Sequence, residues 1–171
     1  MSRVVSSLLI LISLLFACAA FAQDDISSVS ATCNYNDNDQ LVAEYQHVAF
    51  NLKKPLAQQV PFGKVWVPGG KPVTLFTNTQ IQVGPRVLPV GAYTLFVIPT
   101  AKQWTLVVSK STDTKGSYTE QQDLVRVPME TGELPSPASD FSVSFAHAAP
   151  DQCNIRFDAD KYGHIVVFQK R

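Results

Sequence analysis

The segment FSVSF, residues 141–145, alternates apolar and small polar side chains with a period of two. Such alternation is typical of a β-strand that buries one face and leaves the other toward solvent. The same period recurs at Trp104, Leu106 and Val108, and no run longer than ten residues has a convincing helical repeat. The sequence therefore predicts an all-β protein.

Turn residues separate these runs, because glycine, asparagine and aspartate tolerate positive φ and proline removes a backbone donor. We expect about nine or ten short strands, with the proline-containing run 134–139 as a loop. This pattern predicts a single antiparallel β-sandwich or jelly-roll-like domain, and a closed barrel remains the alternative. The runs 93–98 and 165–168 have apolar residues at both odd and even positions, so both faces of each strand are apolar. We expect these strands to be central in a sheet or covered on their second face.

The N-terminus has the pattern of a secretory signal peptide: Arg3, an apolar run over 4–17, and the A-x-A motif Ala20-Phe21-Ala22. We expect cleavage after Ala22, with 1–22 as the signal peptide and no transmembrane segment in the mature chain. Two alternatives stay open, a retained anchor and a lipoprotein modified at Cys18, although Phe16 is bulky for a lipidation motif. The predicted location is extracytoplasmic, either periplasmic or secreted.

Cleavage would remove 22 of the 171 residues and leave 149, which suits one domain over 23–171. Losing Arg3 leaves 13 Lys and Arg against 14 Asp and Glu, so the net charge is close to zero. A chain with this balance has no long-range field for nucleic acid or an anionic membrane. We therefore expect no nucleic-acid partner.

Two cysteines remain after Cys18 leaves with the signal peptide, and an oxidising compartment favours pairing them. Cys33 and Cys153 each share strand parity with apolar neighbours, so both thiols should point toward a buried face. We predict a Cys33–Cys153 disulfide, with two separately buried thiols as the alternative. Neither cysteine has basic neighbours that would lower its thiol pKa for catalysis.

Four sequence blocks in order resemble a bacterial family of secreted proteins, the domain-of-unknown-function 2911 family, over about residues 61–147. The blocks are GKVW (63–66), LPVGAYTL (88–95), WTLVVSK (104–110) and QDLVRV (122–127). The resemblance implies a bacterial, extracytoplasmic β-domain and carries over no activity, cofactor or functional residue. This chain departs where family members read W-R-x-G-A-N: Val67 replaces the arginine, and Gly70 and Lys71 stand at the Ala-Asn pair.

The sequence gives little support for a metal site, because His47, His147 and His164 form no H-x-H or H-x-x-x-H pair. Parity places His47 and His147 at the edge of a core face, and Gly163 before His164 indicates a solvated turn. The acidic runs at 36–39 and 158–160 lack the glycine and glutamate of a calcium loop, so hairpin turns are the better interpretation. We expect no metal and no cofactor.

Catalytic motifs are missing as well: no serine lies in G-x-S-x-G or S-x-x-K. A hydrolase whose carboxylates converge only in the fold stays as the less favoured alternative. Asp123 and Arg126 are three residues apart in a predicted strand, so we expect their side chains on opposite faces without a direct bridge. No catalytic residue is assigned.

An aromatic side chain beside a sharp turn is the best candidate for binding. Trp66 precedes the turn VPGG (67–70), so its ring is either a core anchor or part of an exposed ligand platform. We predict a non-catalytic module that binds a small molecule, a glycan or an envelope protein, and the alternative is a structural domain of the envelope. The predicted ligand-binding residues are Lys64, Trp66, Gly69, Gly70 and Lys71; Trp104 leads an alternating buried run and is assigned to packing.

Overall fold

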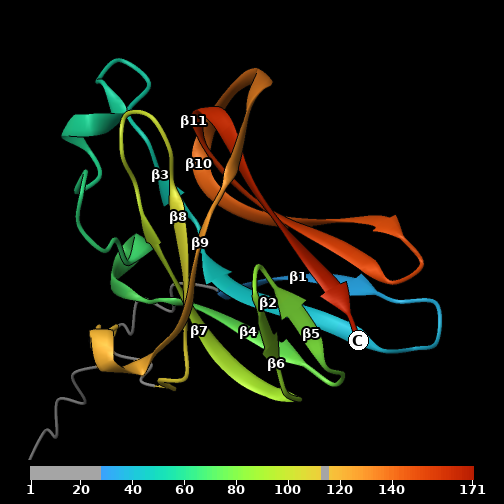
Figure 1. Cartoon of the computed structure of the whole chain (residues 1–171). Helices are drawn as coiled ribbons and strands as arrows, with labels where there is room; N and C mark the ends of the chain where they lie inside the picture. The colour runs from blue at the N-terminus through green and yellow to red at the C-terminus, as the bar shows by residue number, and fades with distance from the viewer. Residues whose placement is uncertain (1–27, 113–115) are drawn as a thin grey trace, which may run out of the picture.

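The computed structural model describes residues 28–112 and 116–171, which form two packed antiparallel sheets (Figure 1). The predicted signal peptide, its cleavage after Ala22 and the alternative at Cys18 lie outside the described residues. The β-sandwich prediction is confirmed, and the order of the strands excludes the closed barrel, because each sheet has two edge strands.

Six strands make one sheet, in the order β1-β2-β4-β7-β8-β9. Their bounds are β1 Ser28–Asn34, β2 Gln40–Gln46, β4 Val73–Thr77, β7 Gly91–Ile98, β8 Thr105–Ser109 and β9 Asp123–Pro128. Five strands make the other sheet, in the order β3-β10-β11-β5-β6. They are β3 Val48–Ala49, β5 Ile81–Val83, β6 Arg86–Leu88, β10 Glu130–Ala149 and β11 Gln152–Lys170. Three short 3₁₀ turns, η1 Leu56–Gln58, η2 Pro68–Gly70 and η3 Glu120–Gln122, lie in the connections.

The core lies between the sheets and follows the alternation in the sequence. Phe141 and Val143 in the opening segment are buried, and Leu41 and Ala43 in β2 are buried on the facing sheet. Burying such side chains contributes about 1.5–3 kcal/mol each, so the paired apolar faces supply most of the stabilisation.

The described residues form eleven strands where nine or ten short ones were expected, and two of the eleven, β10 and β11, are long and make a hairpin. The register of this hairpin is interrupted between Glu133 and Ala138, which matches the predicted proline loop at 134–139 only in part. The strand continues through this run, but Pro135 and Pro137 fall where no residue pairs with β11. A proline lacks the N–H that a ladder needs, so an unpaired bulge accommodates both residues.

Strand β11 changes direction near Asp160 and returns toward its own start, as the red ribbon of Figure 1 shows. The backbone N–H of Lys170 donates to the carbonyl of Asp151 at 2.7 Å, which joins the end of this strand to the turn just before its start. Asp160 has a φ of 50°, in the left-handed region that few non-glycine residues adopt. A Cβ on Gly163 would lie 2.9 Å from Oδ1 of Asp158, so a larger residue there would have to displace the Asp158 carboxylate.

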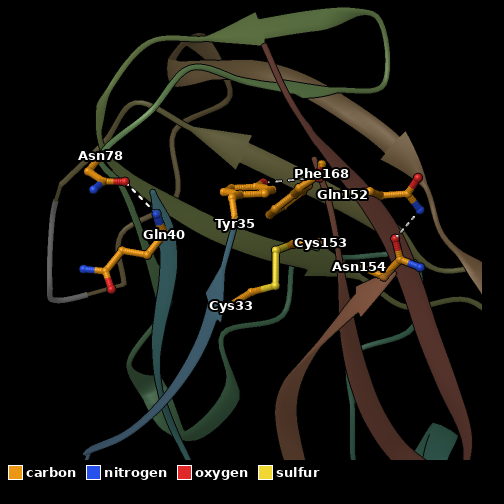
Figure 2. Close-up of a disulfide and its surroundings, with 8 residues drawn as sticks. All are labelled: Cys33, Tyr35, Gln40, Asn78, Gln152, Cys153, Asn154 and Phe168. Atoms are coloured by element: carbon orange, nitrogen blue, oxygen red, sulfur yellow. Dashed lines mark hydrogen bonds between the residues drawn. A yellow bond between two sulfur atoms is a disulfide. The ribbon is translucent and has the colours of Figure 1, made fainter. Parts of the chain in front are cut away.

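The Cys33–Cys153 disulfide is confirmed and joins β1 of one sheet to β11 of the other (Figure 2). Tyr35 lies next to it, and its hydroxyl donates to the carbonyl of Phe168 at 3.3 Å. Burial, with Asp151 and Asp39 nearby, raises the pKa of Tyr35 to about 12, so its hydroxyl stays protonated as a donor. The bridge spans 120 positions, and in the chain-entropy model a loop of this size stabilises the fold by about 4–5 kcal/mol.

Strand β7 is central in its sheet and also covered on its outer face, as its apolar residues on both parities predicted. The ring of Tyr118 meets the ring of Phe96 edge to face, with 5.2 Å between the ring centroids. Phe96 and Val107 are consequently buried on the side that faces away from the sandwich core. The corresponding prediction for 165–168 holds only in part, because Val167 is 40% exposed.

Candidate functional site

A cavity of about 430 Å³ lies at the corner of β11, next to the start of β8. Leu56 and Phe62 line one side from the segment around η1, and Ala101 lines another from the turn between β7 and β8. Trp104, just before β8, and His164, in β11, also line it. The cavity is therefore built by segments that are far apart in the sequence.

The rings of Trp104 and His164 stack face to face, with their centroids 3.9 Å apart and their planes 9° from parallel. Both residues are almost fully buried, with 2% and 3% of their surface exposed. Trp104 therefore packs in the core, as predicted, and also borders the cavity. The stack holds the imidazole in one plane.

The two nitrogens of His164 differ in their surroundings. Nδ1 lies 3.0 Å from the hydroxyl of Thr131, on the paired strand β10. Nε2 is buried and has no hydrogen-bond partner among the described residues. Burial lowers the pKa of His164 to about 4, because the charged imidazolium would lose its hydration, so the ring is neutral near pH 7.

Hydrogen bonds within the two loops hold the walls of the cavity in place. Gln59 donates to the carbonyls of Asn51 and Lys54 at 3.1 and 2.9 Å, and it accepts from the Asn51 N–H at 2.7 Å. The hydroxyl of Thr100 donates to the carbonyl of Gln103 at 2.6 Å across the opposite turn. The cavity is therefore formed before any ligand enters, as small-molecule sites usually are.

Charged groups of opposite sign also line the cavity: Lys102 is exposed, and Asp160 is partly exposed at the corner of β11. Their charges offset one another, so this cavity has no excess of one sign. The left-handed backbone at Asp160 costs about 1 kcal/mol, and strain of this kind is often found at functional sites.

Trp66 lies in the core and not on an open platform, since 8% of it is exposed. Its ring meets those of Trp104 and Phe141 edge to face, with centroids 5.9 and 5.1 Å apart. This packing favours the core-anchor interpretation and places Trp66 directly behind the Trp104–His164 stack. Whether it contributes to ligand binding stays a prediction.

The other predicted ligand-binding residues do not gather around Trp66. Gly69 and Gly70 form η2 with φ values of 65° and 78°, which explains the glycine pair in this turn. Lys71 borders a different hollow on the outer face of the six-stranded sheet, and its Nζ donates to Ser28 Oγ at 2.9 Å. Lys64 is exposed. Among the described residues that line the Trp104–His164 cavity, none belongs to the predicted set.

All three histidines lie where the sequence analysis did not expect them. His164 is buried in β11 and not solvated, because Gly163 belongs to a strand corner and not to a turn. His47 and His147 are exposed, although the β10–β11 register keeps His147 on the parity of Phe145 up to its pairing with Cys153.

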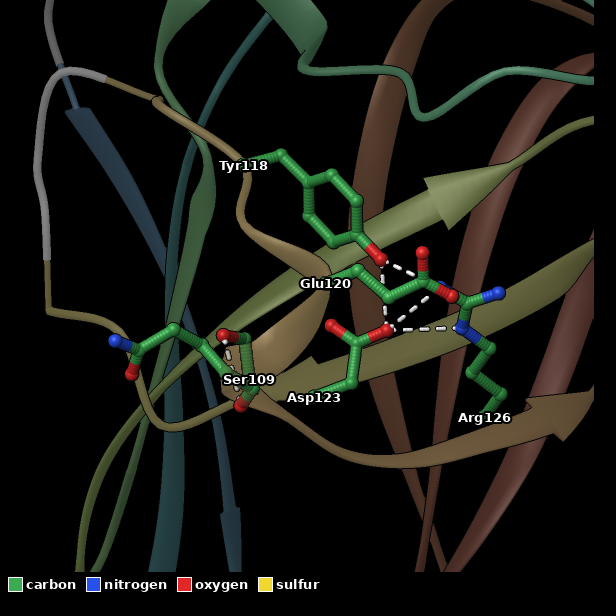
Figure 3. A network of polar contacts seen from close by, with 6 residues as sticks. Ser109, Tyr118, Glu120, Asp123 and Arg126 are labelled. Carbon is green, nitrogen blue, oxygen red and sulfur yellow. Dashed lines mark hydrogen bonds and ion pairs between the residues drawn. The ribbon is translucent and has the colours of Figure 1, made fainter.

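The prediction that Asp123 and Arg126 do not bridge is wrong, as Figure 3 shows. Arg126 Nε donates to Asp123 Oδ2 at 2.8 Å, and the Tyr118 hydroxyl donates to the same oxygen at 2.7 Å. The reason is a bulge: Val108 pairs with Val125 but Ser109 pairs with Asp123, so one extra residue changes the parity. The hydrogen bond to Asp123 raises the pKa of Arg126.

Metal-binding groups are not assembled in the described residues: no three His, Cys, Asp or Glu side chains in 28–112 and 116–171 come together. Asp37 and Asp39 both pair with Lys170, and Asp158 pairs with Arg156. These ion pairs engage Asp37, Asp39 and Asp158 of the acidic runs that had been considered for calcium, and Asp160 lines the cavity. No helix in this part of the chain is long and apolar enough to cross a membrane.

The fold and the cavity together define an antiparallel β-sandwich with an internal disulfide and a preformed site at one end. The family described as "Protein of unknown function (DUF2911)" matches residues 27–166, and the chain belongs to this family. The match extends beyond the four sequence blocks at both ends. No curated protein and no solved structure matches the chain.

Proposed function

We propose that this protein is a non-catalytic binding module that holds a small molecule in the cavity between Trp104, His164 and the segment around η1. One observation carries the proposal: a preformed cavity of about 430 Å³ has mainly apolar walls, which include Trp104 and His164. Concave, mainly apolar pockets with a few polar groups are typical of small-molecule sites.

A glycan is the less favoured ligand. Sugar-binding sites commonly present an open aromatic face for stacking, but one face of Trp104 is covered by His164 and the residue is 2% exposed. Tyr162, 44% exposed, is the most exposed ring among the described lining residues. The geometry therefore favours a molecule that enters the cavity over one that lies flat on the surface.

The disulfide supports a role outside the cytoplasm. The Cys33–Cys153 disulfide indicates an oxidising, extracytoplasmic compartment. We propose that the chain is exported to the periplasm or the medium, with cleavage after Ala22. An exported protein whose mass corresponds to residues 23–171 would support this, and retention of Cys18 with added lipid mass would favour the lipoprotein alternative.

Blocking the cavity tests the binding function. Ala57→Trp places a bulky ring at an exposed position of η1 that lines the cavity, and Ala146→Trp is an exposed control in β10. A metabolite library is screened by thermal shift, since a ligand at 100 times its Kd stabilises by about 2.7 kcal/mol. Hits should be lost in Ala57→Trp and kept in Ala146→Trp. If no compound binds the unaltered protein, the envelope structural domain becomes the better interpretation.

A further inference from the structure

Some of the polar side chains that line the cavity are already paired within the protein. The hydroxyl of Thr100 donates to the carbonyl of Gln103 at 2.6 Å, and the hydroxyl of Thr131 lies 3.0 Å from Nδ1 of the buried His164. These groups hold the walls in place. A ligand is therefore recognised by the polar groups that remain.

Three polar side chains at the cavity remain for a ligand: Lys102, Asp160 and Tyr162. Within residues 28–112 and 116–171, the side chains of these three form no ion pair and no hydrogen bond with another residue. Lys102 and Tyr162 are exposed and Asp160 is partly exposed, so all three are accessible to a molecule that enters from solvent.

The two charged residues have opposite signs and line the same cavity without pairing. Since no ion pair joins Lys102 to Asp160, their charged atoms lie more than 4.0 Å apart. Such a separation suits a ligand that carries both charges, with its carboxylate toward Lys102 and its ammonium toward Asp160. The Tyr162 hydroxyl both donates and accepts, so it can hydrogen-bond to either group of the ligand.

Other kinds of polar ligand use these residues less fully. An anion that approaches Lys102 is repelled by Asp160, and a cation that approaches Asp160 is repelled by Lys102. A neutral polyol can hydrogen-bond to all three side chains, but it gains no attraction between opposite charges. A zwitterion satisfies both charges at once.

The other walls suit an apolar part of the same ligand. Leu56 and Phe62 are partly buried against the core, and Ala101 and the buried Trp104 also line the cavity. The volume of about 430 Å³ lies within the range of roughly 300–1,000 Å³ that is typical of small-molecule sites. The ligand therefore combines a small apolar group with a doubly charged head.

We propose that the cavity binds an amino-acid zwitterion with an apolar side chain, held at its carboxylate by Lys102 and at its ammonium by Asp160. Leucine and phenylalanine belong to this class. The proposal rests on the proposed small-molecule function and adds the class of ligand and the two residues that select it.

Four probes test the proposal when they are titrated into the exported protein at pH 7 and followed by calorimetry. They are L-phenylalanine, 2-phenylethylammonium, which lacks the carboxylate, 3-phenylpropanoate, which lacks the ammonium, and glucose as a polyol. We expect phenylalanine to bind about fivefold more tightly than either singly charged probe, which corresponds to about 1 kcal/mol for an accessible ion pair. Glucose should bind more weakly than phenylalanine.

Two variants assign each charge to its partner. Lys102→Gln should remove the advantage of phenylalanine over 2-phenylethylammonium, and Asp160→Asn should remove its advantage over 3-phenylpropanoate. Asparagine, like aspartate, tolerates a left-handed backbone, so Asp160→Asn preserves the corner of β11. Lys53→Gln and Asp151→Asn change exposed residues that do not line the cavity and should leave both ratios intact.

The possible failures are distinguishable. Phenylalanine binding no better than a singly charged probe, tighter binding of glucose, or a ratio that survives its variant would overturn the zwitterion while leaving a small-molecule cavity in place. No binding by any of the four probes would count against both the zwitterion and the cavity function.

Discussion

The two ends of β8 have opposite surroundings. Trp104 precedes the strand and borders an open cavity, whereas Ser109 ends it beneath the segment that carries Tyr118 and η3. At the Ser109 end, Tyr118 covers Phe96 and joins Asp123 and Arg126 in a compact polar network (Figure 3). The same strand therefore connects an open end with a closed one.

Each end leaves one buried polar atom without a partner among the described residues, His164 Nε2 at the open end and Asp123 Oδ1 at the closed end. Their surroundings differ, because the other oxygen of Asp123 accepts from Tyr118 and Arg126, and Arg126 compensates its charge. His164 instead lines a cavity that a ligand can enter. The comparison teaches that a buried polar side chain points to a function only where it also borders a cavity.

The largest expected effect comes from Trp66→Ala, which removes the ring behind the open end. We expect the free energy of unfolding to fall by about 3–5 kcal/mol, because the cavity left in a packed aromatic cluster is not refilled. Urea unfolding measures the loss. Phe96→Ala is the matched control at the closed end and should cost a similar amount while leaving ligand binding in the cavity intact. A stable Trp66→Ala protein that no longer binds ligand would instead make Trp66 a platform.

The second effect is a pH dependence that belongs to the open end. Because the pKa of His164 is lowered from 6.5 to about 4, the unfolded chain binds a proton between these values that the folded protein does not. Stability should therefore fall as the pH drops from about 6.5 to 4, by about 3 kcal/mol in total, and lose no more from this residue below that. Comparing unfolding curves of the protein and His164→Phe isolates this contribution. Equal pH profiles would contradict it.

At the closed end, Arg126→Gln should reduce stability by about 1–2 kcal/mol, since it leaves the mostly buried carboxylate of Asp123 without its cation. Solvent screening keeps the value low, because the Arg126 side chain is 42% exposed. Thermal unfolding at low and high salt measures it, and Arg86→Gln serves as an exposed control. Ligand binding at the open end should not change; a loss of binding would show that the two ends are coupled.

The smallest effect should follow Tyr118→Phe, which keeps the ring on Phe96 but removes one hydrogen bond to Asp123. We expect a loss of about 1 kcal/mol in the free energy of unfolding. Tyr162→Phe, half exposed at the open end, should change stability by less than about 0.5 kcal/mol. A larger effect from Tyr162 than from Tyr118 would reverse the assignment of open and closed ends.

Much of the fold follows from local patterns that survive in the three-dimensional structure. The alternation at 141–145 places Phe141 and Val143 in the core, and the parity of Cys33 and Cys153 turns both thiols inward. These predictions hold because a straight strand keeps its two faces distinct over its whole length.

The site was harder to predict because it forms where strands are not straight. The bulge opposite Ser109 brings Asp123 next to Arg126, and the corner at Asp160 turns His164 into the core beside Trp104. Parity arguments fail beyond each irregularity, and a short Gly-His sequence looks the same in a turn and in a corner. Asp160 and Gly163 were the features of the sequence that could have predicted this corner.

The proline-containing bulge of β10 has a consequence for how this protein behaves among its own copies. Between Glu133 and Ala138 the strand has no partner in β11, and β3 pairs with β10 only at Asp140 and Phe141 among the described residues. An open strand edge is a template for a second chain, and fibrils grow by such additions. Pro135 and Pro137 have no N–H to donate there, so this edge offers a second copy of the chain fewer hydrogen bonds.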